Sequence, residues 1–114
     1  MTVPGTSPDR GALVWSPFAD EASALAVAHT LVEEQLAACG NIVPGLVSVF
    51  AWQGQVDTVR EVGLLLKTRA ALLDRAVERL AQVHPYDEPA VLGWVCEGGA
   101  EVTLEWLSRL PPSA

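Results

Sequence analysis

The chain has 114 residues, half of them hydrophobic and 18% charged, with a formal net charge of −7. This length and apolar content predict one folded domain with its own core and exclude a disordered chain. Seven basic residues scattered among fourteen acidic ones argue against nucleic-acid binding, because phosphate contacts need clustered positive charge. Two cysteines do not make a disulfide framework, so we expect reduced thiols. The sequence shows no apolar leader and no apolar run long enough to cross a membrane, which predicts a cytoplasmic protein without membrane contact.

The N-terminal third predicts a tail, a strand and a helix. Residues 1–10 are rich in Pro, Gly, Ser and Thr and are expected to be flexible, which leaves residues 11–114 as the single domain. A short strand is expected over 11–16, ended by Pro17. The next helix is expected to run from Asp20 to Ala38, with Gly40 as its C-cap. Its apolar stripe would comprise Leu25, Ala28, Val32 and Leu36.

Two strand-forming runs, 42–52 and 56–68, flank Gln53 and Gly54 and predict a long β-hairpin. Each arm could reach roughly 40 Å at ~3.3 Å per residue, whereas a compact domain of this size has a radius of gyration near ~13 Å. Alternation puts two apolar sets on opposite sides of the first arm: Val43, Val47, Val49 and Ala51 against Leu46, Phe50 and Trp52. Because both sides need cover, we expect contact with neighbouring subunits; the alternative is a hairpin folded onto the chain's own helices.

The C-terminal half predicts a second amphipathic helix over 70–83, a loop over 84–89 that contains two prolines, and a core strand over 90–96. A final helix is expected over 100–110. Its inward side chains would be Val102, Trp106, Leu107 and Leu110. The resulting order is β-α-β-β-α-β with a long central hairpin and an extra C-terminal helix, which is an α+β, ferredoxin-like fold.

The densest polar cluster is His84, Tyr86, Asp87 and Glu88, in the loop after the second helix. An imidazole with two carboxylates could hold a divalent transition metal or act as an acid–base pair. The third interpretation is a rigid turn in which Pro85 and Pro89 fix the backbone and the polar side chains cap the neighbouring helix.

Two further pairs of residues invite a functional interpretation. Glu61 and Lys67 are six residues apart on one strand and therefore share a face of the sheet. They could line a cleft or form an ion pair between subunits, or they could be charges that protect an exposed strand edge. Cys39 and Cys96 could be ligands or nucleophiles, but their apolar neighbours favour buried, inert thiols.

Nearly the whole of 12–110 resembles the CutA family, the divalent-cation tolerance proteins. The pieces that carry the resemblance are LVEEQLAACGNIVPGLVSVFAWQGQV at 31–56, LLLKT at 64–68, HPYDEP at 84–89 and EWL at 105–107. Their joint order and spacing are specific, although each piece alone is weak.

The resemblance implies a non-enzymatic homotrimer whose hairpin arms pair with neighbouring subunits. It also implies a link to tolerance of copper and other divalent cations. The trimeric assembly resembles that of the PII signalling proteins, which suggests the alternative of a sensor that binds a small anionic or nucleotide ligand through Lys67. The cleft between subunits would be lined by Cys39, Trp52, Glu61, Lys67, His84, Tyr86 and Asp87.

The chain departs from the family pattern at four positions. Some members have Cys, His and Glu where this chain has Ser16, Val83 and Ala90, and the usual hairpin Tyr is Phe50. These changes remove a thiolate, an imidazole and a carboxylate. We therefore expect only weak binding of a divalent metal such as Cu(II), with His84 as its ligand, and we keep an enzyme that uses His84 and Asp87 as a third hypothesis.

Overall fold

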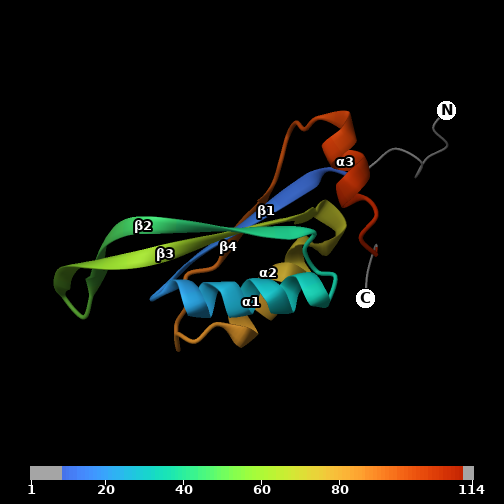
Figure 1. Ribbon diagram of the computed structural model, residues 1–114. Helices are drawn as coiled ribbons and strands as arrows, with labels where there is room; N and C mark the ends of the chain where they lie inside the picture. The colour runs from blue at the N-terminus through green and yellow to red at the C-terminus, as the bar shows by residue number, and fades with distance from the viewer. Residues whose placement is uncertain (1–8, 112–114) are drawn as a thin grey trace.

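The computed structural model describes residues 9–111, which form a four-stranded antiparallel sheet in the order β2-β3-β1-β4. Helices α1 and α2 cover one face of the sheet (Figure 1). This is the predicted ferredoxin-like arrangement, with β2 and β3 as the long hairpin and α3 near the C-terminus. The elements are β1 (Gly11–Phe18), α1 (Glu21–Glu33), β2 (Cys39–Trp52), β3 (Gln55–Arg69), a 3-10 turn (Ala70–Leu72), α2 (Leu73–Val83), β4 (Leu92–Val95) and α3 (Glu101–Leu107).

The core lies between the sheet and the two helices that cover it. Its side chains include Val14, Phe18, Ala24, Leu31, Leu64, Leu66, Ala76 and Leu80. Full burial of a side chain such as Leu or Phe stabilises a fold by about 1.5–3 kcal/mol. Within residues 9–111, none of the helices combines the length and the apolar content that a membrane crossing requires.

The start of the domain is fixed by polar contacts just before β1. The carboxylate of Asp9 accepts the Ala71 N–H at 2.7 Å, and the carbonyl of Arg10 accepts the Ala70 N–H at 2.8 Å. Residues 9 and 10 of the predicted tail therefore belong to the folded domain, and residues 1–8 lie outside the described residues.

Strand β1 continues through Pro17 to Phe18, two residues past its predicted end. Pro17 pairs with Gly63 of β3, whereas pairing with β4 stops at Trp15. At Pro17 the strand therefore has a neighbour on one side only, and such an edge tolerates a residue without an N–H.

Helix α1 begins after the N-cap Asp20, whose side chain accepts the Ser23 N–H at 2.8 Å. Its buried residues are Ala24, Val27, Ala28 and Leu31. The predicted stripe was partly wrong, because Leu25 and Val32 are exposed. Apolar residues occupy so much of this helix that periodicity alone gives two possible faces, and the buried face carries both small and large side chains.

The predicted end of α1 was also wrong. The helix ends at Glu33, and Gln35 adopts a positive φ of 60°. The Gln35 N–H bonds to the Val32 carbonyl and the Leu36 N–H to the Leu31 carbonyl, which is a Schellman end with glutamine in place of glycine. Gly40, the predicted C-cap, is instead the second residue of β2.

The hairpin turn is Gln53-Gly54, as predicted, with φ values of 50° and 79°. A bulge between Val43 and Leu46 contains Gly45, whose φ is 79°. The bulge adds one residue to β2, so Val43 and Leu46 face the same side of the sheet, opposite Gly63 and Glu61 of β3. Grouping Val43 with Val47 was therefore wrong, because strict alternation does not survive a bulge.

The hairpin projects far beyond the rest of the chain (Figure 1). The molecule measures 56 × 25 × 22 Å, with a radius of gyration of 15.5 Å. Val49 and Val56 near the tip keep 68% and 75% of their surface exposed. The hairpin is thus not folded onto the chain's own helices, and its apolar side chains are left uncovered by this chain.

The C-terminal elements confirm the predicted order but not the predicted burial. Helix α2 buries Ala76 and Leu80, as its pattern indicates. Strand β4 was expected in the core, yet all four of its residues are exposed, because it is an edge strand of the sheet. In α3, Leu107 is buried, whereas Val102 and Trp106 are exposed and not inward as predicted.

Candidate functional site

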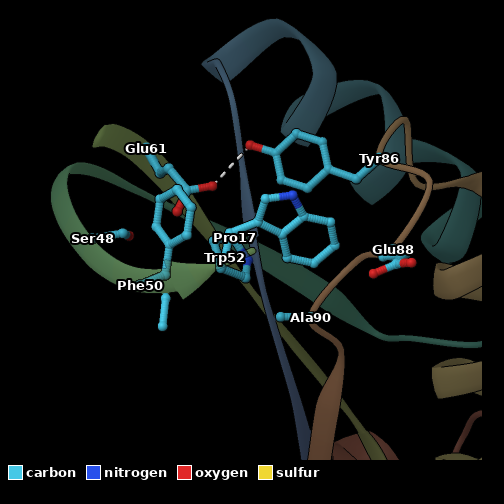
Figure 2. A pocket seen from close by; sticks show the side chains of 9 residues that line it. Pro17, Ser48, Phe50, Trp52, Glu61, Tyr86, Glu88 and Ala90 are labelled. Carbon is cyan, nitrogen blue, oxygen red and sulfur yellow. Dashed lines mark hydrogen bonds between the residues drawn. The ribbon is translucent and has the colours of Figure 1, made fainter. Parts of the chain in front are cut away.

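A pocket of about 440 Å³ lies where the hairpin meets the loop between α2 and β4 (Figure 2). Its walls come from three parts of the chain: the end of β1, the distal half of the hairpin, and the loop. The residues that line it are Pro17, Ser48, Phe50, Ala51, Trp52, Glu61, Tyr86, Glu88 and Ala90. The volume and the largely apolar walls are typical of sites for small molecules.

His84 anchors the loop that forms one wall of this pocket. Its Nε2 donates to the Pro17 carbonyl oxygen at 2.9 Å, and its Nδ1 accepts the Tyr86 N–H at 3.1 Å. The ring stacks on Phe18 with a centroid separation of 4.0 Å. Burial lowers the pKa of His84 from its ordinary value of 6.5, although the Pro17 carbonyl and the charge of Glu61 oppose that effect. These contacts identify the neutral imidazole with its proton on Nε2.

Tyr86 closes the polar end of the pocket against the hairpin. Its hydroxyl donates to Glu61 Oε2 at 2.8 Å, as the dashed line in Figure 2 marks. Burial, together with the hydrogen bond and the negative charge of Glu61, raises the pKa of Tyr86 to about 12. The hydroxyl therefore stays protonated at neutral pH and joins the loop to β3.

Of the seven predicted cleft residues, the pocket brings together Trp52, Glu61 and Tyr86. His84 lies behind this group, its ring 4.8 Å from that of Tyr86. Asp87 is exposed and is not part of the lining.

Cys39 and Lys67 lie elsewhere, near the opposite end of β3, where they are paired across the sheet. Lys67 lines a separate pocket of about 160 Å³ together with Cys96. Both thiols are free and half-buried, so they are more exposed than the sequence indicates. Whether neighbouring subunits unite the seven residues into one cleft stays a prediction.

The described residues do not fit a strong metal site. No group of three or more His, Cys, Asp or Glu side chains in the range 9–111 is placed to hold a metal ion. Both ring nitrogens of His84 already make hydrogen bonds within the protein. A metal ion could bind this imidazole only if one of those bonds broke.

Several lining residues were not among the seven predicted cleft residues, and they include Pro17, Ser48 and Ala90. Glu88 also lines the pocket, and the sequence indicated it only as part of the polar cluster in the loop. Their proximity depends on the loop crossing the end of β1, where Ser16 Oγ donates to the Ala90 carbonyl at 2.8 Å. No local pattern indicates that contact, because the two residues are 74 positions apart. Two of the positions where the chain departs from the family pattern, Phe50 and Ala90, line this pocket, and a third, Ser16, is hydrogen-bonded to Ala90.

Comparison with known proteins gives one consistent result. Residues 12–109 match the model of the CutA1 divalent ion tolerance protein family. The chain is 42% identical over 87 residues to the divalent-cation tolerance protein CutA of Thermus thermophilus, a match that covers 76% of this chain and 84% of that protein. It is 44% identical over 83 residues to the chloroplastic protein CutA of Arabidopsis thaliana, which covers 73% of this chain and 46% of the relative. The match thus spans about half the length of that plant protein.

Solved structures agree with the sequence matches. The crystal structure of CutA from Xylella fastidiosa has a TM-score of 0.83 and 36% identity, and the alignment covers 88% of this chain and 96% of that one. That of the divalent cation tolerance protein from Thermus thermophilus has a TM-score of 0.82 and 38% identity, with 88% and 97% covered. The chain therefore belongs to the CutA1 family of divalent ion tolerance proteins.

Proposed function

We propose that this chain is a non-enzymatic, homotrimeric protein that contributes to divalent-cation tolerance or metal-responsive signalling. The observation that carries the assembly is the projecting hairpin, where Val47, Val49, Phe50, Trp52 and Val56 are all exposed. Apolar surface of this extent on a projecting element is typical of an interface between subunits. The role in cation tolerance is supported by the names of the CutA relatives.

Light scattering coupled to gel filtration tests the assembly. At micromolar concentration the protein should elute with three times the mass of the 12.1 kDa chain. A monomer at that concentration would remove the main support for the proposal. A complementation assay tests the role: the chain should restore growth at raised Cu(II) to a bacterial strain that lacks its own CutA protein.

Metal binding itself is proposed to be weak, in the micromolar range or poorer. Binding at His84 must break a hydrogen bond to Pro17 or Tyr86, and the described residues supply no group of three ligands around it. Calorimetry with Cu(II) on tag-free protein should show that His84→Ala abolishes binding, whereas Cys96→Ser leaves it unchanged. Tight binding that survives His84→Ala would place the site elsewhere.

The pocket supports a second candidate function, a PII-like sensor of small molecules. Its volume of about 440 Å³ suits a small ligand, and its lining combines aromatic rings with a few polar groups. In the proposed trimer the pocket would lie beside the cleft between subunits, because its wall belongs to the projecting hairpin. A thermal-shift screen of metal ions, nucleotides and small organic molecules distinguishes the two candidates, since a ligand that binds the folded state raises the midpoint.

The compartment remains a proposal as well. We place the protein in the cytoplasm on the basis of its reduced cysteines, Cys39 and Cys96. Related proteins named chloroplastic in Arabidopsis thaliana and rice indicate that the family is not confined to one compartment. Cell fractionation with an antibody against the chain would test the proposal.

A further inference from the structure

The loop between α2 and β4 is fastened at both ends to the last residues of β1. At its start, His84 Nε2 donates to the Pro17 carbonyl oxygen at 2.9 Å, and the imidazole ring stacks on Phe18. At its end, Ser16 Oγ donates to the Ala90 carbonyl oxygen at 2.8 Å. His84 and Ser16 are both buried. The two ends of the loop are therefore fixed within one chain, whatever a neighbouring subunit covers.

The middle of the loop is held more loosely. In the described part of the chain, a single side-chain hydrogen bond links it to the sheet, from the Tyr86 hydroxyl to Glu61 Oε2 of β3 at 2.8 Å (Figure 2). Both side chains are half-buried, and the next loop residues, Asp87 and Glu88, are exposed. A hydrogen bond to a carboxylate is stronger than one between neutral groups. This one contact therefore does most to keep the middle of the loop against β3.

The position of Tyr86 decides whether His84 has a free nitrogen. Nε2 carries the proton because it faces the Pro17 carbonyl, so the lone pair is on Nδ1. The Tyr86 N–H occupies that lone pair at 3.1 Å, and the Tyr86 ring lies 4.8 Å from the imidazole. A neutral imidazole binds a metal ion or attacks an electrophile through its unprotonated nitrogen. While Tyr86 stays in place, that nitrogen of His84 is occupied.

We propose that the hydrogen bond between Tyr86 and Glu61 is a latch that controls access to His84 Nδ1. When the latch opens, the stretch 85–89 leaves β3 and the Tyr86 N–H leaves the imidazole, while the bonds at both ends of the loop hold. The inference rests on the proposed metal binding at His84 and adds a regulation of it. The fraction of molecules with an open latch limits how readily Nδ1 is used, as for any binding-competent minor state.

Carbethoxylation by diethyl pyrocarbonate measures this access and uses no metal. The reagent acylates imidazole at the nitrogen with the lone pair, and peptide mass spectrometry distinguishes the two histidines of the chain, His84 and the exposed His29. Burial holds the pKa of His84 below 6.5, so its ring is neutral at about pH 7.5. His84 should react at least about tenfold more slowly than His29, because an open state of this kind is a minor population.

Two variants remove the latch from opposite sides. Tyr86→Phe keeps the aromatic ring but lacks the hydroxyl, and Glu61→Ala lacks the acceptor. Each should raise the reaction rate of His84 at least about fivefold, as loss of a hydrogen bond to a charged group implies. The double variant should show no further rise, because the second change removes a bond already lost. The rate of His29 should stay the same in all three variants.

Glu33→Gly is the matched control for unfolding of the whole chain. It weakens the C-terminal end of α1 and leaves the latch in place, so the rate of His84 should rise less than in Tyr86→Phe. Melting curves and light scattering establish that each variant keeps the fold and the mass of the wild type.

Four results would overturn the latch. They are an unchanged rate of His84 in Tyr86→Phe, an equal rise in Glu33→Gly, additive effects in the double variant, and a wild-type His84 that reacts as fast as His29. Because no metal is present, a failure of copper binding leaves these rates unaffected. A failure of the latch likewise leaves the trimer and the role in cation tolerance to light scattering and the growth assay.

Discussion

Two single residues illustrate how closely the sheet and the loop are packed. A Cβ built on Gly63 would lie 2.1 Å from the Trp15 ring, so the indole lies directly over the bare backbone of β3. His84 lies in a similarly confined site, 7% exposed and bonded through both ring nitrogens. Substitution or protonation at either position should therefore lower the stability of the protein.

Gly63→Ala should destabilise the protein by about 1–3 kcal/mol, because the added methyl group forces the Trp15 ring out of its place. Urea denaturation monitored by tryptophan fluorescence would measure the loss. Gly98→Ala is the control, since an added Cβ there meets nothing within 4 Å. Equal stability of the two variants would contradict the close contact between Trp15 and Gly63.

The stability of the protein should fall in mild acid because of His84. Its pKa is lower in the folded state than the ordinary value of 6.5, so the unfolded chain binds the extra proton first. The contribution of the neutral His84 to the free energy of unfolding is complete above about pH 6.5. It is lost as the pH falls from there towards the lower pKa of the folded state. One such proton gives a slope of at most about 1.4 kcal/mol per pH unit.

Denaturation between about pH 5 and 7.5 would measure this slope. His84→Gln should flatten it, because glutamine does not titrate. His29→Gln, at the exposed histidine of α1, should keep the slope of the wild type. A slope that persists in His84→Gln would assign the effect to another group.

At the scale of the elements, the C-terminal end of helix α1 holds a strained residue whose replacement should stabilise the protein. Gln35 has a φ of 60°, a conformation that costs a residue with a side chain about 1 kcal/mol and costs glycine much less. The Schellman hydrogen bonds of this end involve the backbone only, so a change of side chain leaves them intact.

Gln35→Gly should therefore stabilise the protein by roughly 0.5–1 kcal/mol. Glu33→Gly makes the same type of change two residues earlier, at the last residue of the helix. It should destabilise the protein by about 1 kcal/mol. Thermal denaturation of both variants and the wild type would show whether stability rises in Gln35→Gly and falls in Glu33→Gly. A loss of stability in Gln35→Gly would mean that its side chain makes contacts that outweigh the backbone strain.

At the scale of the whole molecule, the distribution of apolar surface is uneven. The core beneath α1 and α2 is well buried, whereas the hairpin and β4 expose large side chains such as Val49, Trp52, Leu92 and Trp94. The two regions lie on one continuous sheet, because β4 and the hairpin strands flank β1 on opposite sides. These exposed side chains are the surface that the proposed trimer would cover.

Trp52→Ala should weaken assembly more than it disturbs the fold of the chain, since aromatic residues dominate the energetics of interfaces. A loss of about 2 kcal/mol would raise the dissociation constant roughly thirtyfold. Gln55→Ala is the control, because Gln55 pairs with Trp52 across the same turn but is polar. Light scattering during dilution would show the effect, and a Trp52→Ala variant as stable in assembly as Gln55→Ala would refute it.

Local chemistry was sufficient for most of the secondary structure. Gly54 after Gln53 specified the hairpin turn, the prolines at 85 and 89 ended α2, and the period of Leu72, Ala76 and Leu80 gave its buried face. The order of these elements then led to the ferredoxin-like fold. These features depend on contacts between residues close in the sequence, so patterns of spacing reveal them.

Only the tertiary structure decided the arrangement of the pocket and the limits of several elements. The link from Ser16 to Ala90, the contact of Tyr86 with Glu61 and the separation of Lys67 from that pair depend on how the loop crosses the end of β1. The bulge at Gly45 changed which residues of β2 share a face, and packing selected the face of α1 that carries Ala24, Val27, Ala28 and Leu31. Such outcomes follow from packing between distant segments, and a linear pattern of residue types carries no record of which distant segments meet.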